Sequence, residues 1–187
     1  KNRGKVSLIS GDELKKISTL KTPNNVLALF KIPSSKFVNS EGLVLALDEI
    51  NDPGNLGTII RLCDWFGIEQ LVCSKGTVDC YNPKVVQASM GSLTRVNIVY
   101  TNLESYLTET KKPTYASLMS GENVYKSKLP QDAVLVMGNE ANGISKPILK
   151  LLNNSVSIPR FGDLKQTESL NVATATAILL SEFKRLT

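Results

Sequence analysis

From residue 43 onward, short apolar runs alternate with stretches of helical periodicity. Six of these runs predict β-strands, at residues 43–48, 70–75, 96–100, 113–119, 133–139 and 155–159. Runs that are apolar at consecutive positions suit strands buried on both faces, and the helical stretches between them can supply the crossovers that parallel strands require. The alternation therefore predicts an α/β fold, with a mostly parallel sheet and helices on both of its faces.

The chain contains no histidine. It therefore cannot form a Ser-His-Asp triad, an imidazole general base or a histidine metal site. The three cysteines, Cys63, Cys73 and Cys80, include no C-x-x-C pair, so we expect no metal. No apolar run reaches the ~18 residues of a membrane span, and no charged-then-apolar leader opens the chain. We therefore expect that the protein has no membrane partner and is located in the cytoplasm.

Basic residues are concentrated in the first 40 positions. The net charge is +5, and residues 1–40 hold eight Lys or Arg against Asp12 and Glu13, whereas the remainder is close to neutral. This segment fits an arm that contacts polyanions, or a soluble extension with ordinary lysines, and charge alone does not separate the two. The sequence VNSEG indicates a boundary near residue 40.

In parallel sheets, ligands bind beyond the carboxyl ends of the strands, so the strand-to-helix turns are the candidate sites. The first unusual turn is NDPGNLGTIIRLCDWFG, in which Asp52 before a proline predicts a helix start and Gly67 a helix end. The helix face opposite the apolar one carries Gly54, Gly57 and Arg61. Two glycines in a first turn indicate close approach by backbone or ligand; the alternative is a loose turn beside a solvated arginine.

The second turn is LVMGNEANGIS. Gly138 and Gly143 have the spacing of a phosphate-binding loop, but Ile144 replaces its lysine, which disfavours a nucleoside triphosphate site. No G-x-G-x-x-G motif occurs, which argues against a dinucleotide site. The turn, with Asn139 and Glu140, can still present backbone groups to a flat heterocycle. The alternative is a tight turn whose glycines adopt positive φ.

The third turn precedes the last helix, which we expect to start near Ser169 and to be largely buried. Ser169, Asn171 and Thr174 would then be buried polar groups at a helix N-terminus, and a ligand is one way to supply their partners. The alternative is capping by Thr167 or Ser169, together with internal hydrogen bonds.

Taken together, the three turns resemble the SpoU/TrmH branch of the SPOUT RNA methyltransferases. NDPGNLGTIIRLCDWFG is similar to the first motif of that family, LVMGNEANGIS to the second, and IPRFG with ESLNVATATAILL to the third. The resemblance covers residues 43 to 187. ISTLKTPNNVLALFKIP is similar to the tail of the small domain that often precedes the catalytic domain. Residues 1–40 are thus expected to be the remnant of an RNA substrate-binding domain with its linker, and 41–187 a methyltransferase domain.

The resemblance implies a C-terminal trefoil knot, a homodimer, S-adenosylmethionine as methyl donor, and RNA as substrate. The implied reaction is 2′-O-methylation of a ribose in rRNA or tRNA, with guanosine the expected nucleotide. By motif position, the residues expected to hold the cofactor, largely through backbone groups, are Gly138, Asn139, Gly143, Ile158 and Leu170. The residues that match the active-site positions of the family are Asn55, Arg61, Glu140, Ser169 and Asn171.

Two features depart from the family pattern. Arg160 and Phe161 follow Pro159, where many members carry Met, and DLKQT lengthens the loop before Glu168. These differences bear on loop geometry and on the fit to RNA.

The family proposal assigns the general base to the arginine that matches Arg61, yet the pKa of arginine normally exceeds ~12. We favour a clamp, in which Arg61 binds the target phosphate and orients the hydroxyl while its proton leaves late or through phosphate or water. Glu140 would orient Arg61 or place Asn55. The alternative function is a non-catalytic RNA-binding protein with the same fold, which the presence of Asn55, Arg61 and Asn171 disfavours. A nucleoside triphosphatase ranks third.

Overall fold

The computed structural model describes residues 6–18, 20–34, 37, 41–162 and 169–185. The chain forms two compact units, Lys1–Ser34 and Ser35–Thr187. The first contains helix α1 (Gly11–Ile17), none of whose residues is buried. Its start is a capping box, in which Ser10 Oγ accepts from the amide of Glu13 and the carboxylate of Glu13 accepts from the amide of Ser10. This helix was not predicted, although the Ser-x-x-Glu spacing is a known start signal.

The second unit is built on a six-stranded sheet in the order β3-β2-β1-β5-β4-β6. Its strands are β1 (Val44–Leu47), β2 (Gln70–Ser74), β3 (Asn97–Thr101), β4 (Thr114–Asn123), β5 (Val134–Met137) and β6 (Asn154–Ser157). Every neighbouring pair is parallel. The predicted parallel sheet is confirmed, and each predicted strand is present with ends that differ by up to four residues.

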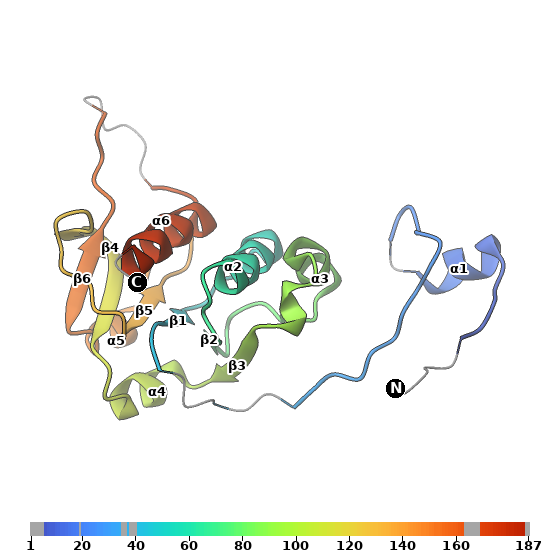
Figure 1. Ribbon diagram of the computed structural model, residues 1–187, viewed down its shortest axis with the longest axis horizontal. Coiled ribbons are helices and arrows are strands. Elements are labelled where there is room, and N and C mark those ends of the chain that lie inside the picture. The colour runs from blue at the N-terminus through green and yellow to red at the C-terminus, as the bar shows by residue number, and fades with distance from the viewer. Residues whose placement is uncertain (1–5, 19, 35–36, 38–40, 163–168, 186–187) are drawn as a thin grey trace. The chain divides into compact units, whose positions relative to one another are not determined.

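Helices cover both faces of this sheet (Figure 1). One layer contains α2 (Pro53–Trp65), α3 (Pro83–Ser89) and α6 (Val172–Lys184), with the short 3-10 helix η1 (Ser92–Thr94); the other contains α4 (Leu103–Glu109) and α5 (Lys146–Leu149). Side chains of β1 alternate between two cores: Leu45 and Leu47 pack with α2 and α6, whereas Val44 and Ala46 pack with α4 and α5. The sheet is therefore buried on both faces, as predicted.

Helix α2 begins and ends where the sequence predicts. Asp52 accepts a hydrogen bond from the amide of Asn55 at 2.7 Å, and Gly67 follows the helix with φ +63°. Gly57 is buried against α3, and a Cβ on it would lie 2.4 Å from Cβ of Ala88. Packing of the two helices thus accounts for this glycine, and no ligand is needed to explain it.

The candidate site lies where two neighbouring strands, β1 and β5, end. The chain leaves β1 into α2 on one face of the sheet and leaves β5 into α5 on the other face, while β1 and β5 pair directly. Such a divergence opens a crevice at the carboxyl ends of the strands.

None of the described helices has the length and hydropathy to cross a membrane.

Candidate active site

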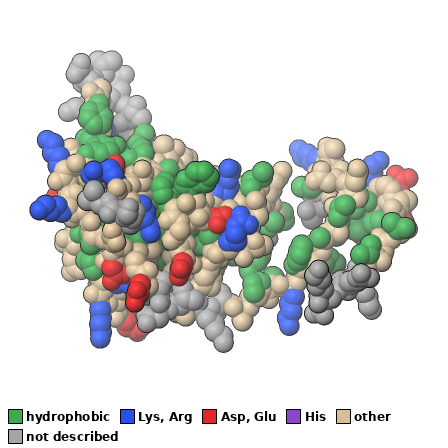
Figure 2. Space-filling view, viewed as in Figure 1, with side chains coloured by type: hydrophobic (Ala, Val, Ile, Leu, Met, Phe, Trp, Pro, Cys, Tyr) green, Lys and Arg blue, Asp and Glu red, His purple; other side chains and the backbone are tan. Residues whose placement is uncertain are grey.

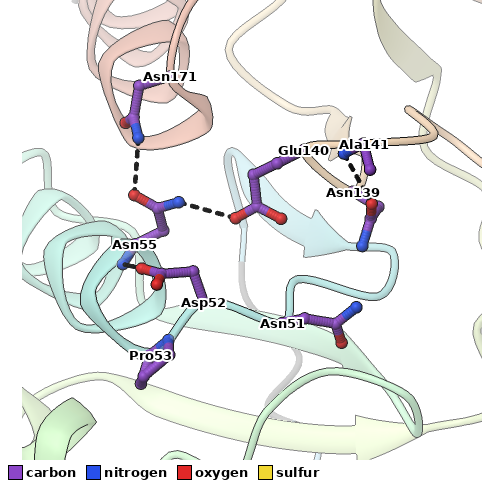
Figure 3. Close-up of a pocket in the computed structure, with 8 residues that line it drawn as sticks. All are labelled: Asn51, Asp52, Pro53, Asn55, Asn139, Glu140, Ala141 and Asn171. Carbon is purple, nitrogen blue, oxygen red and sulfur yellow. Dashed lines mark hydrogen bonds between the residues drawn. The ribbon is translucent and has the colours of Figure 1, made fainter.

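The three unusual turns meet around one open pocket of about 650 Å³ at this crevice, lined mostly by polar residues (Figure 3). Its lining comes from the start of α2, the loop after β5 and the start of α6: Asn51, Asp52, Pro53, Asn55, Asn139, Glu140, Ala141 and Asn171. Residues far apart in the sequence therefore share a single surface. Of the ten site residues expected from the sequence, this pocket brings together Asn55, Asn139, Glu140 and Asn171.

Asn55 lies at the centre of a hydrogen-bond chain. Its Oδ1 accepts from Nδ2 of Asn171 at 2.9 Å, and its Nδ2 donates to Oε1 of Glu140 at 2.8 Å. A carboxylate only accepts, so the bond to Glu140 requires the amide nitrogen of Asn55 on that side. One side chain thus joins the first, second and third turns.

Asn171 also caps helix α6. Its Oδ1 accepts from the amides of Ala173 and Thr174, at 3.0 and 3.2 Å. The expected start near Ser169 is therefore wrong: the helix begins at Val172, because the amide side chain of Asn171 satisfies the first free N–H groups. The other cap considered, Thr167, lies outside the described residues.

The expectation that Ser169, Asn171 and Thr174 are buried is also wrong. All three are exposed, because α6 starts at the open pocket and its buried face begins with Val172 and Ala173. The fully buried polar residue of this helix is Thr176, whose hydroxyl donates to the carbonyl of Val172 at 2.7 Å.

The loop after β5 is held by its own backbone. Asn139 and Gly143 exchange two backbone hydrogen bonds, at 3.0 and 2.8 Å, and Gly143 has φ +67°. A Cβ on Gly138 would lie 2.2 Å from the amide nitrogen of Ile144. The tight turn itself thus requires both glycines, but only Gly143 has the positive φ that the simpler interpretation expected of both, and Gly138 is required by the close approach of Ile144.

The side chain of Asn139 supports the same loop. Its Oδ1 accepts from the amides of Ala141 and Asn142, and its Nδ2 donates to the carbonyl of Glu49 at 2.7 Å. These bonds shape the loop and tie it to the end of β1.

Sequence reasoning missed Asp48, which immediately follows β1. Its side chain is buried, and Oδ2 accepts from the amide of Ser145 at 2.7 Å. This contact and the Asn139–Glu49 bond hold the second turn against the first. A carboxylate that directly follows a fully apolar strand is the signal that could have found it.

The remaining expected residues lie outside the pocket lining. Arg61 is exposed on α2, and the described part of the chain contains no hydrogen bond or ion pair to it. Ile158 is half-buried after β6, and Leu170 is 47% exposed just before α6. Ile144, at the position of the phosphate-loop lysine, is buried with α5, which further disfavours a triphosphate site.

Comparisons with known proteins agree on one family. The model of the SpoU rRNA Methylase family matches residues 42–181. The chain is 33% identical over 177 residues to the 23S rRNA (guanosine(2553)-2′-O)-methyltransferase RlmP of Bacillus subtilis, covering 92% of this chain and 70% of that protein. It is 36% identical over 148 residues to the 23S rRNA (guanosine-2′-O-)-methyltransferase RlmB of Neisseria meningitidis, covering 76% of this chain and 58% of that protein.

Solved structures show the same fold. A protein of the TrmH family from Porphyromonas gingivalis superposes with a TM-score of 0.89 at 41% identity, covering 97% of this chain and 74% of that one. The SpoU methyltransferase AviRb of Streptomyces viridochromogenes, solved in complex with AdoMet, gives a TM-score of 0.74 at 28% identity, covering 83% and 66%.

Proposed function

The chain belongs to the SpoU rRNA Methylase family, and from that premise we propose that it transfers a methyl group from S-adenosylmethionine to a ribose 2′-hydroxyl in RNA. The observation that carries this proposal is the hydrogen-bond chain from Asn171 through Asn55 to Glu140. It gathers amide and carboxylate groups from three separate turns at the crevice where such sheets bind ligands.

The proposed substrate is a guanosine in rRNA. Support comes from the names of the relatives RlmP and RlmB, both of which describe guanosine 2′-O-methylation of 23S rRNA. The chain spans 58–70% of the length of these two proteins, so the substrate of the whole protein is part of the proposal.

The residues near the pocket suit S-adenosylmethionine. Apolar surface remains accessible at Leu170 and in part at Ile158, which fits an adenine ring, and the carboxylate of Glu140 complements a sulfonium charge. We propose that Ile158, Leu170 and the loop from Gly138 to Gly143 hold the cofactor, mainly through backbone groups. When bound, it supplies a methyl group on a cationic sulfur that carries its own leaving group.

The polar residues of the pocket would then position the ribose. The amides of Asn55 and Asn171 are held in fixed orientations by Glu140 and by the first amides of α6, so their positions are set before RNA binds. Ser169, exposed two residues before Asn171, is proposed to help fix the cofactor and the ribose. The 2′-hydroxyl proton leaves to water or phosphate as the methyl bond forms.

Arg61 is proposed as the phosphate clamp. Its exposure leaves the guanidinium available to an RNA phosphate, and a guanidinium binds phosphate through a bidentate pair. Because Arg61 is outside the pocket lining, it would act on RNA that extends beyond the ribose site.

A homodimer is the proposed assembly. Trp65, the last residue of α2, is 84% exposed. An exposed tryptophan on a helix surface supports burial against a second copy. Light scattering is expected to give twice the monomer mass.

The C-terminal trefoil knot is proposed on connectivity. Strand β6 lies at the sheet edge, whereas Asn171, fourteen residues after the last residue of β6, bonds Asn55 beside central strand β1. The chain therefore returns from the edge toward the middle, which supports threading of the last segment. Residues 1–40 are proposed to belong to an RNA-binding domain with its linker, and the cytoplasm is the proposed compartment.

Methyl transfer can be tested directly. The protein is incubated with labelled S-adenosylmethionine and 23S rRNA, and the RNA is digested to nucleosides for mass spectrometry. We expect 2′-O-methylguanosine to accumulate. Methyl transfer to a base, or RNA binding without transfer, would contradict the proposal, and the latter result would favour the non-catalytic alternative.

A further inference from the structure

Two exposed aromatic rings lie together beyond the carboxyl ends of β4 and β6. Tyr125 and Phe161 have ring centroids 6.2 Å apart with planes inclined by 34°, and they are 41% and 81% exposed. The pair Tyr115–Phe183 differs, since Phe183 there is 2% exposed and belongs to the core. A ring as exposed as that of Phe161 contributes little to folding, so its contact with Tyr125 calls for another explanation.

The position of the pair relates it to the pocket. Tyr125 follows β4 by two residues and Phe161 follows β6 by four, and β4 and β6 are paired. Both rings thus follow the carboxyl ends of parallel strands, as Glu140 does after β5, so all three residues lie at the same end of the strands. A strand of RNA that runs along these carboxyl ends would meet both the pocket and the rings.

Basic residues lie close to the two rings in the sequence. Lys126, Lys128 and Arg160 are exposed within three residues of one ring or the other, and the nearby acidic residue among those described is Glu122. Figure 2 shows Lys and Arg side chains beside hydrophobic ones in the region where β4 and β6 end. Aromatic rings flanked by cations suit single-stranded nucleic acid, because every base has a face to stack and every phosphate a negative charge.

We propose that Tyr125 and Phe161 form a stacking platform for an unpaired base of the RNA substrate, near the nucleotide whose ribose enters the pocket. This inference rests on the proposed methyltransferase function and adds to it a preference for single-stranded RNA. In a duplex, neighbouring bases cover each other's faces, so the platform selects a target in a loop or bulge.

The test measures stacking directly. The probe is a single-stranded RNA of about 12 nucleotides that contains one 2-aminopurine, whose fluorescence is quenched when the base stacks, used with and without its complementary strand. Wild-type protein is expected to quench the single strand and to bind it more tightly than the duplex. Phe161→Ala is expected to weaken single-strand binding about tenfold and to relieve the quenching.

Three further variants separate stacking from other effects. Phe161→Leu keeps an apolar side chain without a ring and should fail like Phe161→Ala, whereas Phe161→Tyr should restore quenching. Tyr81→Ala removes an exposed tyrosine, 38% exposed, that precedes α3, and serves as the matched control with unchanged RNA binding. Circular dichroism checks that each variant is folded.

Several outcomes would overturn the platform. Unchanged quenching in Phe161→Ala would exclude stacking. An equal loss of S-adenosylmethionine affinity would assign the rings to the cofactor, and a change in mass by light scattering would assign them to an interface between copies. Because binding and quenching are read without methyl transfer, failure of the platform is distinguishable from failure of the enzymatic function, in which wild-type protein would transfer no methyl group to RNA.

Discussion

Asn171 donates a hydrogen bond to Asn55 across 116 residues of sequence, at 2.9 Å. The same amide of Asn171 caps α6, and Asn55 donates onward to Glu140. The start of the last helix is therefore coupled to the start of α2 and to the loop after β5. A change at Asn55 should disturb all three turns at once.

Replacement of Asn55 by aspartate tests the hydrogen bond that Asn55 donates to Glu140. Asn55→Asp puts two carboxylates within hydrogen-bond distance, which favours protonation of one of them. We expect methyl transfer about 100-fold below wild type at neutral pH. The ratio of the variant's methyl-transfer rate to that of wild type should recover as the pH falls, because a protonated carboxyl at position 55 again donates to Glu140. In Asn55→Ala the ratio should stay low at every pH, and recovery there as well would contradict the role of the donor.

Variants of Arg61 distinguish a clamp from a base. Arg61→Ala should lower methyl transfer about 100-fold with S-adenosylmethionine affinity unchanged, and it should not destabilise the fold because the side chain is exposed. Arg61→Lys keeps the charge without the bidentate geometry, so the clamp predicts partial activity and an unaltered pH profile. A rate that climbs toward the lysine pKa of about 10.4 would instead indicate a base.

The packing of α2 on α3 depends on Gly57. Gly57→Ala should lower the free energy of unfolding by about 1–3 kcal/mol, because its Cβ would lie 2.4 Å from Cβ of Ala88 and 2.9 Å from the carbonyl oxygen of Val85. Adding Ala88→Gly removes the first clash and leaves the second, so it should restore part of the loss. Urea titration of both variants measures this, and Gly57→Ala with wild-type stability would refute the packing.

Acid stability should depend on Asp64 of α2. Its carboxylate accepts from Arg95 at 2.7 Å and from Ser92 at 2.7 Å, and these hydrogen bonds, Arg95 first, hold the pKa of Asp64 below its ordinary value. The folded state thus favours the ionised form, so the stabilisation is complete above the unfolded pKa of about 3.9 and is lost as the pH falls through the lower folded value.

The variant Asp64→Asn should therefore have a lower Tm than wild type at neutral pH, and the difference should shrink below about pH 3. Asp12→Asn is the control, because Asp12 forms only an exposed ion pair with Lys15 at 3.7 Å, and this variant should change the Tm little. A Tm difference for Asp64→Asn that is the same at acid and neutral pH would contradict the assignment.

The sheet and the first functional helix were predictable because their signals are local. Alternating apolar runs located all six strands, and Asp52 with Pro53 marked the start of α2. Asn82 before Pro83 is the same signal and marks α3. The start of α6 was not predicted, since Ser169 and Asn171 are both good caps and the choice depends on the contact with Asn55.

The membership of the site was predictable in part. The resemblance to the SpoU/TrmH motifs indicated Asn55, Glu140 and Asn171, which the pocket brings together. It did not show that Asn55 is the bridge, because side-chain orientation follows from packing of distant turns. The role of Gly57 was ambiguous for the same reason. A glycine is needed there because Ala88 approaches it closely, and sequence spacing does not show that the helix carrying Ala88 packs beside α2.

The position of the transferred methyl group is the most direct measurement. RNA methylated with labelled S-adenosylmethionine by wild-type protein and by Asn55→Ala is hydrolysed in alkali, which cannot cleave after a 2′-O-methylated ribose. The proposed chemistry predicts that wild-type label appears in alkali-resistant dinucleotides and that the Asn55→Ala variant yields little. Label released wholly as mononucleotides, or equal label from both proteins, would contradict a 2′-O-methyltransferase centred on Asn55.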